Sequence, residues 1–412
     1  MDKEKTTVND KERFIDRLLS MKFNIKGISF EMIDILFVVI LWLAALIIRI
    51  KLLPVQSADY YGFLYPWMEK IEELGGFSSM GTKISDYASS YMYLMCYVQS
   101  VTDDWLTGLK VVSYIFDFAA SVAIFMIVYQ LTKSTRKSIA AMTILLLSPA
   151  VIIDSAYYCQ CDSIYTFFIL LAIYFILKKN SRLCMIMIGV AFSFKFQTIF
   201  ILPFIVILWL RKYVIKLIDF IWIPVIYVIS IIPAWMFGRS LKDLLLIYFA
   251  QGNEYTWGTL NFPNFYSLMD EAMPNYHMGE VLSVPGILMT LMLLGLLAYY
   301  IYAKKVSFEN NHELIIITAI FTVALTVYTL PHIHERYGFL IDILAIIYAI
   351  KRPRRIPLMC AFFTVTVIIY MIYLTGVYVF SMQTMTIVET VLIMILGIDL
   401  YKEINSISKS SS

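Results

Sequence analysis

The chain has 412 residues, of which 60% are hydrophobic and only 15% are charged, and its mean hydropathy is +0.76. These values exclude an ordinary soluble protein, in which about 25% of the residues are charged. The net charge of +3 is too small to indicate a nucleic-acid partner, and the five scattered cysteines provide neither a disulfide framework nor a four-ligand zinc site.

Apolar segments recur along almost the whole chain, with no composition shift that would mark a second domain. A membrane core of about 30 Å requires roughly 20 apolar helical residues, so the sequence predicts an all-α polytopic membrane protein of about 12 transmembrane helices. We expect a single membrane domain over 33–401, between tails at 1–32 and 402–412. The expected spans, several of them short, are 33–50, 110–132, 138–153, 163–177, 183–196, 198–210, 215–236, 282–303, 313–330, 337–350, 356–378 and 383–400.

Lysine and arginine are distributed unevenly between the loops that join these spans. With the N-terminus in the cytoplasm, 24 of the 33 basic residues lie inside and nine outside. This partition follows the positive-inside rule and predicts that both termini are cytoplasmic. Two long aromatic-rich segments, about 52–109 and 237–281, then lie outside, and we expect the first to carry amphipathic helices in the membrane interface.

Carboxylates dominate the polar content of the first outer segment. Asp59 follows the first span almost directly, and Asp86 lies further along the same loop. An ionised aspartate near the membrane surface can take the proton of a sugar hydroxyl as its oxygen attacks, which is general-base catalysis. The alternative is that each aspartate caps a helix or solvates the interface.

Two of the four histidines lie together between the expected ninth and tenth spans, in the run His332-Ile333-His334-Glu335-Arg336. Two imidazoles and a guanidinium suit an anionic phosphate, with Glu335 available to orient one of them. The alternatives are a capped loop with an interfacial Arg–Glu pair, or a zinc site that would still need a third ligand. We favour anion recognition and expect no metal.

Other ionisable and amide residues lie near the same face. Gln160 lies in the turn between the third and fourth spans, and Lys195 lies between the fifth and sixth, where it either extends to the interface or meets an anion. Asp117 lies inside the second span, where it is a functional candidate or pairs with Lys110 two turns earlier.

Aromatic side chains of the second outer segment offer flat surfaces for sugar rings. Tyr255 and Trp257 are the stacking candidates. The alternative is that they belong to the aromatic belt of the membrane interface, where tyrosine and tryptophan are common.

Taken together, these segments resemble the GT-C superfamily of membrane glycosyltransferases, and most closely the endoplasmic-reticulum glucosyltransferases of asparagine-linked glycosylation and their bacterial relatives. The resemblance covers about residues 33–350. Arg336 stands where the eukaryotic members usually have lysine, and the Lys-Gln turn has one residue inserted. The matching pieces, which occur in the same order, are Asp59-Tyr60, Trp67, Asp86-Tyr87, Tyr158-Cys159-Gln160-Cys161-Asp162, Lys195-Phe196-Gln197 and His332-Ile333-His334-Glu335-Arg336.

The resemblance implies an inverting hexosyltransferase with a polyprenyl-phosphate-sugar donor and a lipid-linked or cell-wall glycan acceptor. Asp59 would be the base, and no metal or other cofactor would be required. Residue composition and the short chain favour a bacterial plasma membrane, with the site on its extracytoplasmic face. The residues that would contact the donor phosphate or the substrates are His332, His334, Glu335, Arg336, Lys195, Gln160 and Asp86.

Three other classes of protein share such a topology. They are a transporter or flippase of lipid-linked glycans, a phosphoethanolamine-type or acyl transferase, and a non-catalytic subunit of a polysaccharide export complex. A transporter predicts charged or broken mid-span helices in both halves of the chain. Apart from Asp117, the candidates here gather on one face, which favours an enzyme.

Overall fold

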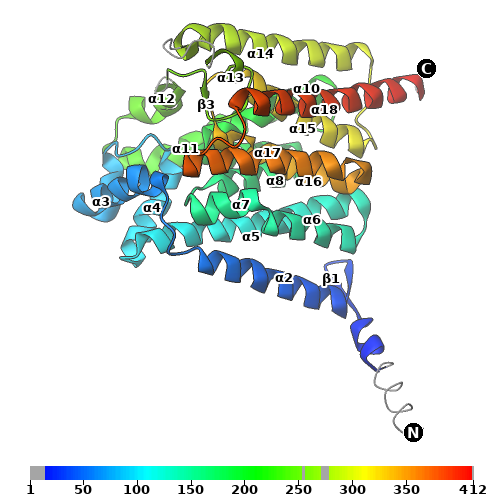
Figure 1. Ribbon diagram of the computed structural model, residues 1–412, viewed down its shortest axis with the longest axis horizontal. Helices are drawn as coiled ribbons and strands as arrows, with labels where there is room; N and C mark the ends of the chain where they lie inside the picture. Colours follow the sequence, from blue (N-terminus) through cyan, green and yellow to red (C-terminus); the bar gives the residue numbers. More distant parts are fainter. Residues whose placement is uncertain (1–13, 253–255, 271–277, 411–412) are drawn as a thin grey trace.

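The computed structural model describes residues 14–252, 256–270 and 278–410, which are mostly helical. Figure 1 shows the long helices lying side by side along one direction, with α3, α4 and α12 at one end of the bundle and β1 and the last turns of α18 at the other. The helices are α2 Met32–Lys51, α3 Tyr65–Glu73, α4 Ser89–Val101, α5 Trp105–Thr132, α6 Thr135–Leu147, α7 Pro149–Ile152, α8 Asp162–Leu177, α9 Ser181–Phe194, α10 Leu202–Leu210, α11 Trp222–Met236, α12 Leu241–Gly252, α13 Ser267–Asp270, α14 Met278–Ala303, α15 His312–Thr329, α16 Phe339–Lys351, α17 Ile356–Thr375 and α18 Met382–Ser410.

Short elements complete the chain. An N-terminal hairpin pairs β1 with β2 in antiparallel register, and β3 pairs with β4 in parallel. The strands are β1 Lys22–Ile25, β2 Ile28–Glu31, β3 Thr259–Leu260 and β4 Ile333–His334. Two π-helical and five 3₁₀ segments are η1 Tyr60–Leu64, η2 Gly76–Gly81, η3 Ile153–Tyr157, η4 Phe196–Ile201, η5 Leu217–Ile221, η6 Glu335–Gly338 and η7 Pro353–Arg355.

Side-chain caps fix where several helices begin. Asp104 accepts a hydrogen bond from the Thr107 N–H at the start of α5, and Asn180 accepts one from the Leu183 N–H at the start of α9. At the other end of a helix, Gly376 takes a left-handed φ of 67° and stops α17. These are ordinary helix start and stop signals, which place the loops at the two ends of the bundle.

The multi-pass membrane character expected from the sequence is present. Within the described residues, seven helices are long and apolar enough to cross a membrane, or eight if the bent pair formed by α6 with α7 and η3 is one span. The structure does not confirm the expected count of about 12. The physical reason is length, because at a rise of about 1.5 Å per residue α8, α9 and the η4–α10 segment are all shorter than those seven helices.

Burial separates central from peripheral helices. In the most apolar segment of each helix, 72% of α15 is buried inside the protein, whereas only 17% of α14 and 22% of α2 are buried. In Figure 1, α14 and α2 accordingly lie at opposite edges of the bundle. A helix that is apolar all round and largely unburied is matched to lipid rather than water.

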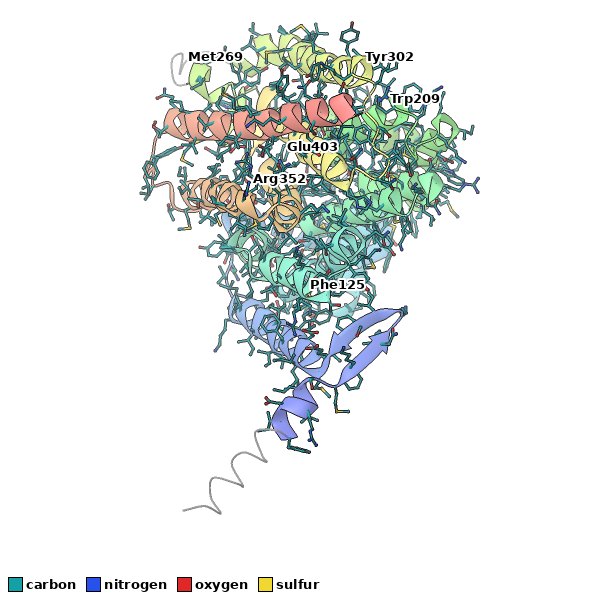
Figure 2. The ribbon with its side chains drawn as sticks, turned by 90° about the vertical axis from the view of Figure 1, so that its right-hand side faces the viewer. Phe125, Trp209, Met269, Tyr302, Arg352 and Glu403 are labelled. Carbon is teal, nitrogen blue, oxygen red and sulfur yellow. The ribbon has the colours of Figure 1, made fainter. Side chains whose placement is uncertain are left out.

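The loops rich in basic residues meet at the end of the bundle that carries the two termini. Lys179 pairs with Glu309, and Arg211 donates to the Val306 carbonyl. Arg352 pairs with Glu313 and with Glu403, and Figure 2 shows this end face on. The loops that the charge distribution assigns to one side of the membrane therefore do lie together.

The opposite end is covered by a helical layer, which we call the platform and which comprises residues 60–101. The first long loop therefore is helical, as expected, in α3 and α4. Its apolar side chains, among them Met68 and Met95, form one buried cluster with residues of α11 and α12 such as Tyr227 and Tyr248. The platform therefore packs against α11 and against α12, which belongs to the second long outer segment.

The separation of the two ends can be tested by cysteine labelling. Cys360 is the exposed cysteine among the five, so a Cys360→Ser background suits single cysteines at Ser78 on the platform and Lys304 at the other end. We expect a membrane-impermeant maleimide to modify the two positions from opposite sides of the membrane. Modification of both from the same side would contradict the arrangement of loops.

Candidate functional site

One cavity, of about 940 Å³, lies beneath the platform and collects the polar residues singled out from the sequence. They reach it from five separate chain segments: the turn after α2, the bend before α4, the turn before α8, the α9–η4 junction, and β4 with η6. The eight that line it are Asp59, Asp86, Gln160, Lys195, His332, His334, Glu335 and Arg336. Residues up to 277 positions apart in the sequence (59 to 336) therefore form one site.

The turn that carries Asp59 is fixed at the end of α2. The buried Lys110 ammonium donates to the carbonyls of Leu52, Leu53 and Val55 at 2.8, 3.2 and 2.5 Å, so it caps the last carbonyl groups of that helix. Ser57 Oγ donates to the Tyr158 carbonyl at 2.8 Å. Asp59 is therefore held against the segment that precedes α8.

The Asp59 carboxylate is only 3% exposed and is surrounded by donors. Gln160 Nε2 donates to Asp59 Oδ2 at 2.7 Å, and the Tyr373 hydroxyl donates to Oδ1 at 2.6 Å. Arg336 Nη1 lies 3.3 Å from Oδ2. These contacts fix the orientation of the carboxylate and join the first outer loop to α17 and to η6.

The backbone that precedes Gln160 has an unusual conformation, which determines the position of this residue. Gln160 follows the π-helical turn η3 and Cys159, whose φ is +63°. The Gln160 carbonyl accepts from Ser113 Oγ at 2.7 Å, and its side-chain Oε1 accepts from the Tyr87 hydroxyl at 2.9 Å. Single π-helical turns are frequent at functional sites, and here two of them, η1 and η3, flank Asp59 and Gln160.

Arg336 and Glu335 form the charged centre of the site. Arg336 Nε donates to Glu335 Oε1 at 2.9 Å, and the Arg336 side chain is 13% exposed. Burial opposes ionisation of Glu335, but the Arg336 guanidinium and His334 outweigh it and lower the pKa of this carboxyl. Burial likewise disfavours the Arg336 charge, yet Glu335 and Asp59 raise its pKa well above the usual value. Both groups therefore remain charged.

The Arg336 Nη1 atom faces Asp59. It is buried and makes no hydrogen bond of good geometry within the described residues, but it forms an ion pair with Asp59 Oδ2 at 3.3 Å. The guanidinium side chain itself lines the cavity, and a guanidinium presents five N–H donors in a fixed fork that suits an oxyanion.

The two histidines differ in their surroundings. His332 Nδ1 lies 2.8 Å from the Trp257 carbonyl and its Nε2 lies 2.5 Å from Ser283 Oγ, so both ring nitrogens are engaged by protein groups. Because a carbonyl only accepts, Nδ1 carries a proton and donates it to Trp257, and in the neutral ring Nε2 then accepts from the serine hydroxyl. His334 Nδ1 lies 3.7 Å from Glu335 Oε2, and its ring packs on Tyr337. His332 thus fastens the β3–β4 region to α14, whereas His334 belongs to the charged centre.

Lys195 meets an anion, one of the two situations expected from the sequence. Its Nζ lies 2.6 Å from Asp162 Oδ1, and the ammonium also lies 6.0 Å from the centre of the Tyr87 ring and 5.9 Å from that of Tyr165. The lysine lines the cavity, so its positive charge is presented there beside that of Arg336.

Asp117 pairs with Arg49 rather than with Lys110. Arg49 Nη2 lies 2.8 Å from Asp117 Oδ2, and both side chains are completely buried. Ser155 Oγ donates to the same carboxylate at 2.6 Å, and Ser163 Oγ donates to its other oxygen. The alternative pairing was wrong because the Lys110 ammonium is used by the carbonyl groups at the end of α2.

Most of the remaining wall of the cavity is apolar. It runs between η4–α10 and the middle of α14, away from the carboxylates and cations. Its side chains include Leu202, Val206 and Leu210 on one wall and Leu291 and Leu294 on the other. The cavity is therefore amphiphilic, with charged groups at one end and an apolar groove at the other.

The last three candidates from the sequence, which are Asp86, Trp257 and Tyr255, differ in whether they line the cavity. Asp86 lines the cavity, and the described residues give its carboxylate no hydrogen bond or ion pair. Trp257 is not among the described residues that line the cavity, and its carbonyl accepts from His332. Tyr255 lies outside the described residues. The described ranges contain no group of three or more His, Cys, Asp or Glu placed to hold a metal ion.

Two contacts of the site were not anticipated. Tyr373 lies in an apolar span, where nothing in the local sequence separates it from other membrane tyrosines, yet it hydrogen-bonds Asp59. Arg49 lies near the end of the first span, and only its position beside a membrane boundary could have suggested an intramembrane partner for Asp117.

The different roles of the histidines lead to a stability experiment. His332→Ala leaves the Ser283 hydroxyl and the Trp257 carbonyl without this partner, so we expect a loss of about 1–3 kcal/mol in the free energy of unfolding. His334→Ala should cost less. Thermal unfolding of both variants in one detergent measures the difference, and equal losses would contradict the assignment of His332 to the scaffold.

No known family model, curated protein or solved structure matches this chain. The chemistry of the cavity and of its lining side chains is therefore the ground on which its function is inferred.

Proposed function

We propose that this chain is an inverting membrane glycosyltransferase that moves a hexose from a polyprenyl-phosphate donor to a lipid-linked or cell-wall glycan. The observation that carries the proposal is the single amphiphilic cavity, whose charged end holds Arg336 and Lys195 and whose apolar groove lies between α10 and α14. A polyprenyl phosphate has the same division, with an anionic head and a long hydrocarbon chain.

The donor phosphate would lie at Arg336, near His334 and Lys195. Arg336 lines the cavity, and Glu335 and Asp59 raise its pKa, so it stays cationic while the ligand is present. The isoprenoid chain would follow the groove lined by α10 and α14, where burial of hydrocarbon contributes about 25 cal/mol per Å². This placement leaves the sugar beneath Asp59, Asp86 and the platform.

The reaction is a direct displacement at the anomeric carbon. The acceptor hydroxyl oxygen forms the new bond to that carbon while Asp59 takes the hydroxyl proton, and the bond from the anomeric carbon to the phosphate oxygen breaks. Gln160 and Tyr373 hold the carboxylate in one orientation. The charge that develops on the leaving lipid phosphate is stabilised by Arg336, because fixed cations in a partly dry site need little rearrangement.

The finer membrane arrangement belongs to the same proposal. The end with Lys351, Arg352, Arg354 and Arg355 would face the cytoplasm of a bacterial cell, as the excess of basic residues favours. The platform and the cavity would then face outward. Twelve passes require that α8, α9, η4–α10 and α16 each count as a short span, which buried helices surrounded by protein can accommodate.

Kinetic measurements can distinguish the role of Asp59 as a base from the role of Arg336 in binding the donor phosphate. Asp59→Asn keeps the size and most hydrogen bonds but removes the base, so we expect turnover to fall by about 10²-fold or more with little change in donor affinity. Arg336→Ala removes a phosphate contact and should weaken donor affinity, with a further loss of turnover if that contact strengthens in the transition state. Turnover and donor binding are measured in nanodiscs with a panel of polyprenyl-phosphate hexoses and lipid-linked acceptors.

Asp86→Asn is the matched variant, because this carboxylate lines the same cavity but has no partner among the described residues. If Asp59→Asn keeps near-normal turnover while Asp86→Asn loses it, Asp86 is the base. Binding of the donor without any transfer to the acceptors would instead favour a transporter or a non-catalytic subunit.

Metal independence is a separate expectation. The phosphate already has Arg336 and Lys195 as cationic partners, so activity should survive an excess of EDTA. Loss of activity on chelation, followed by recovery with magnesium or manganese, would reassign Asp59 and Asp86 as metal ligands.

A further inference from the structure

A pair of buried carboxyl groups lies behind the wall of the cavity. Asp154 in η3 and Asp162 at the start of α8 are both completely buried. Asp162 is the charged group that acts most strongly on the Asp154 carboxyl, and the two side chains are in hydrogen-bond contact. Among the described residues no donor reaches either oxygen of Asp154 or Oδ2 of Asp162.

The chain holds the two carboxyl groups in this position. Their sequence neighbours Ser155 and Ser163 both donate to Asp117, which is itself paired with Arg49. The two segments are therefore clamped by one buried ion pair. Asp154 and Asp162 are kept close by this clamp, so their proximity is a fixed property of the fold.

Among the described residues two cations act on the pair, and one of them contacts it directly. Lys195 Nζ lies 2.6 Å from Asp162 Oδ1 and neutralises one negative charge. Arg336 also acts on Asp154, but its guanidinium is already engaged by Glu335 and lies beside Asp59.

The other titratable groups that interact electrostatically with Asp154 are phenols and thiols, which supply no positive charge. They come from α4, the segment before α8, α8 and α17, and are Tyr91, Cys159, Cys161, Tyr165 and Tyr370. Two carboxylates in contact away from water, with one cation bound to only one of them, repel too strongly for both to be ionised. An added proton removes the repulsion and supplies the missing hydrogen-bond donor.

We propose that Asp154 and Asp162 share one proton, and that the hydrogen bond between them holds the Asp162 carboxylate against Lys195. Asp154 is then a positioning residue: it touches no ligand, but it fixes the acceptor that aims the Lys195 ammonium at the cavity. The part that concerns ligand affinity rests on the proposed function, because it takes the ligand to be an anionic lipid phosphate. The shared proton itself does not depend on that function.

The proton can be observed directly by infrared spectroscopy of the whole protein in nanodiscs. The difference between the wild type and Asp154→Asn should contain the carbonyl stretch of a protonated carboxylic acid, which shifts in deuterated water. Asp103→Asn, at an exposed loop position, is the control and should leave that region of the spectrum unchanged. Absence of the band at Asp154 overturns the proposal whatever the protein binds.

Matched amides test the positioning role. Asp154→Asn supplies an N–H donor in place of the acid O–H, so affinity for a fluorescent polyprenyl phosphate should stay within about 2-fold of the wild type. Asp162→Asn removes the carboxylate that holds Lys195, and the affinity should fall by about 10-fold or more because a charge-assisted contact is lost. Equal losses in the two variants would overturn the positioning role.

The two proposals fail in different ways. If wild-type protein does not bind polyprenyl phosphate, the proposed donor class is wrong while the infrared result still decides on the proton. If Asp162→Asn does not fold, the infrared comparison and the affinity of Asp154→Asn remain, and a 10-fold loss in Asp154→Asn alone would show that the amide does not replace the acid.

Discussion

The ion pair between Arg49 and Asp117 is the interaction on which the arrangement of the site depends. Moving two charges out of water costs several kcal/mol each, and a buried pair is retained only when its remaining donors and acceptors are well used. Asp117 accepts from Ser155 and Ser163, and Arg49 also donates to the Ala45 and Leu146 carbonyls. One pair thus joins α2, α5, the α6–η3 bend and α8, and it fixes the loop that carries Gln160.

A series of contacts connects this ion pair to the charged residues that line the cavity. Gln160 orients Asp59, Asp59 lies beside Arg336, and Arg336 pairs with Glu335. The first two steps join segments that are distant in the sequence, and each of these four groups is held by at least one other. Networks of this kind resist local rearrangement, because breaking one contact leaves a buried charge without its partner. The cavity is therefore preorganised in the absence of a ligand.

The sequence predicted the membrane class and the helical first loop, and it singled out eight polar residues that the structure brings to one cavity, because each of these depends on local signals. Hydropathy marks spans, basic residues mark one set of loops, and Asp59 and Arg336 stand out among apolar neighbours. Contacts across the bundle were not predictable. The partner of Asp117 was missed because pairing depends on how α2 and α5 pack, and Tyr373 was missed because a span tyrosine has no distinguishing neighbour. The expected number of spans was not confirmed, since short helices such as α9 fall below the length of the seven helices that can cross a membrane.

The lightly buried α14 has a consequence for how any occupant reaches the groove. This helix forms one wall of the apolar end of the cavity, and most of its spanning surface faces away from the protein. In Figure 1 this helix lies at the edge of the bundle, which agrees with its low burial. For an occupant that dissolves in the bilayer, the quantity that governs occupancy is then its mole fraction there. Diluting a suspension of vesicles would leave that fraction unchanged, whereas adding inert lipid would lower it.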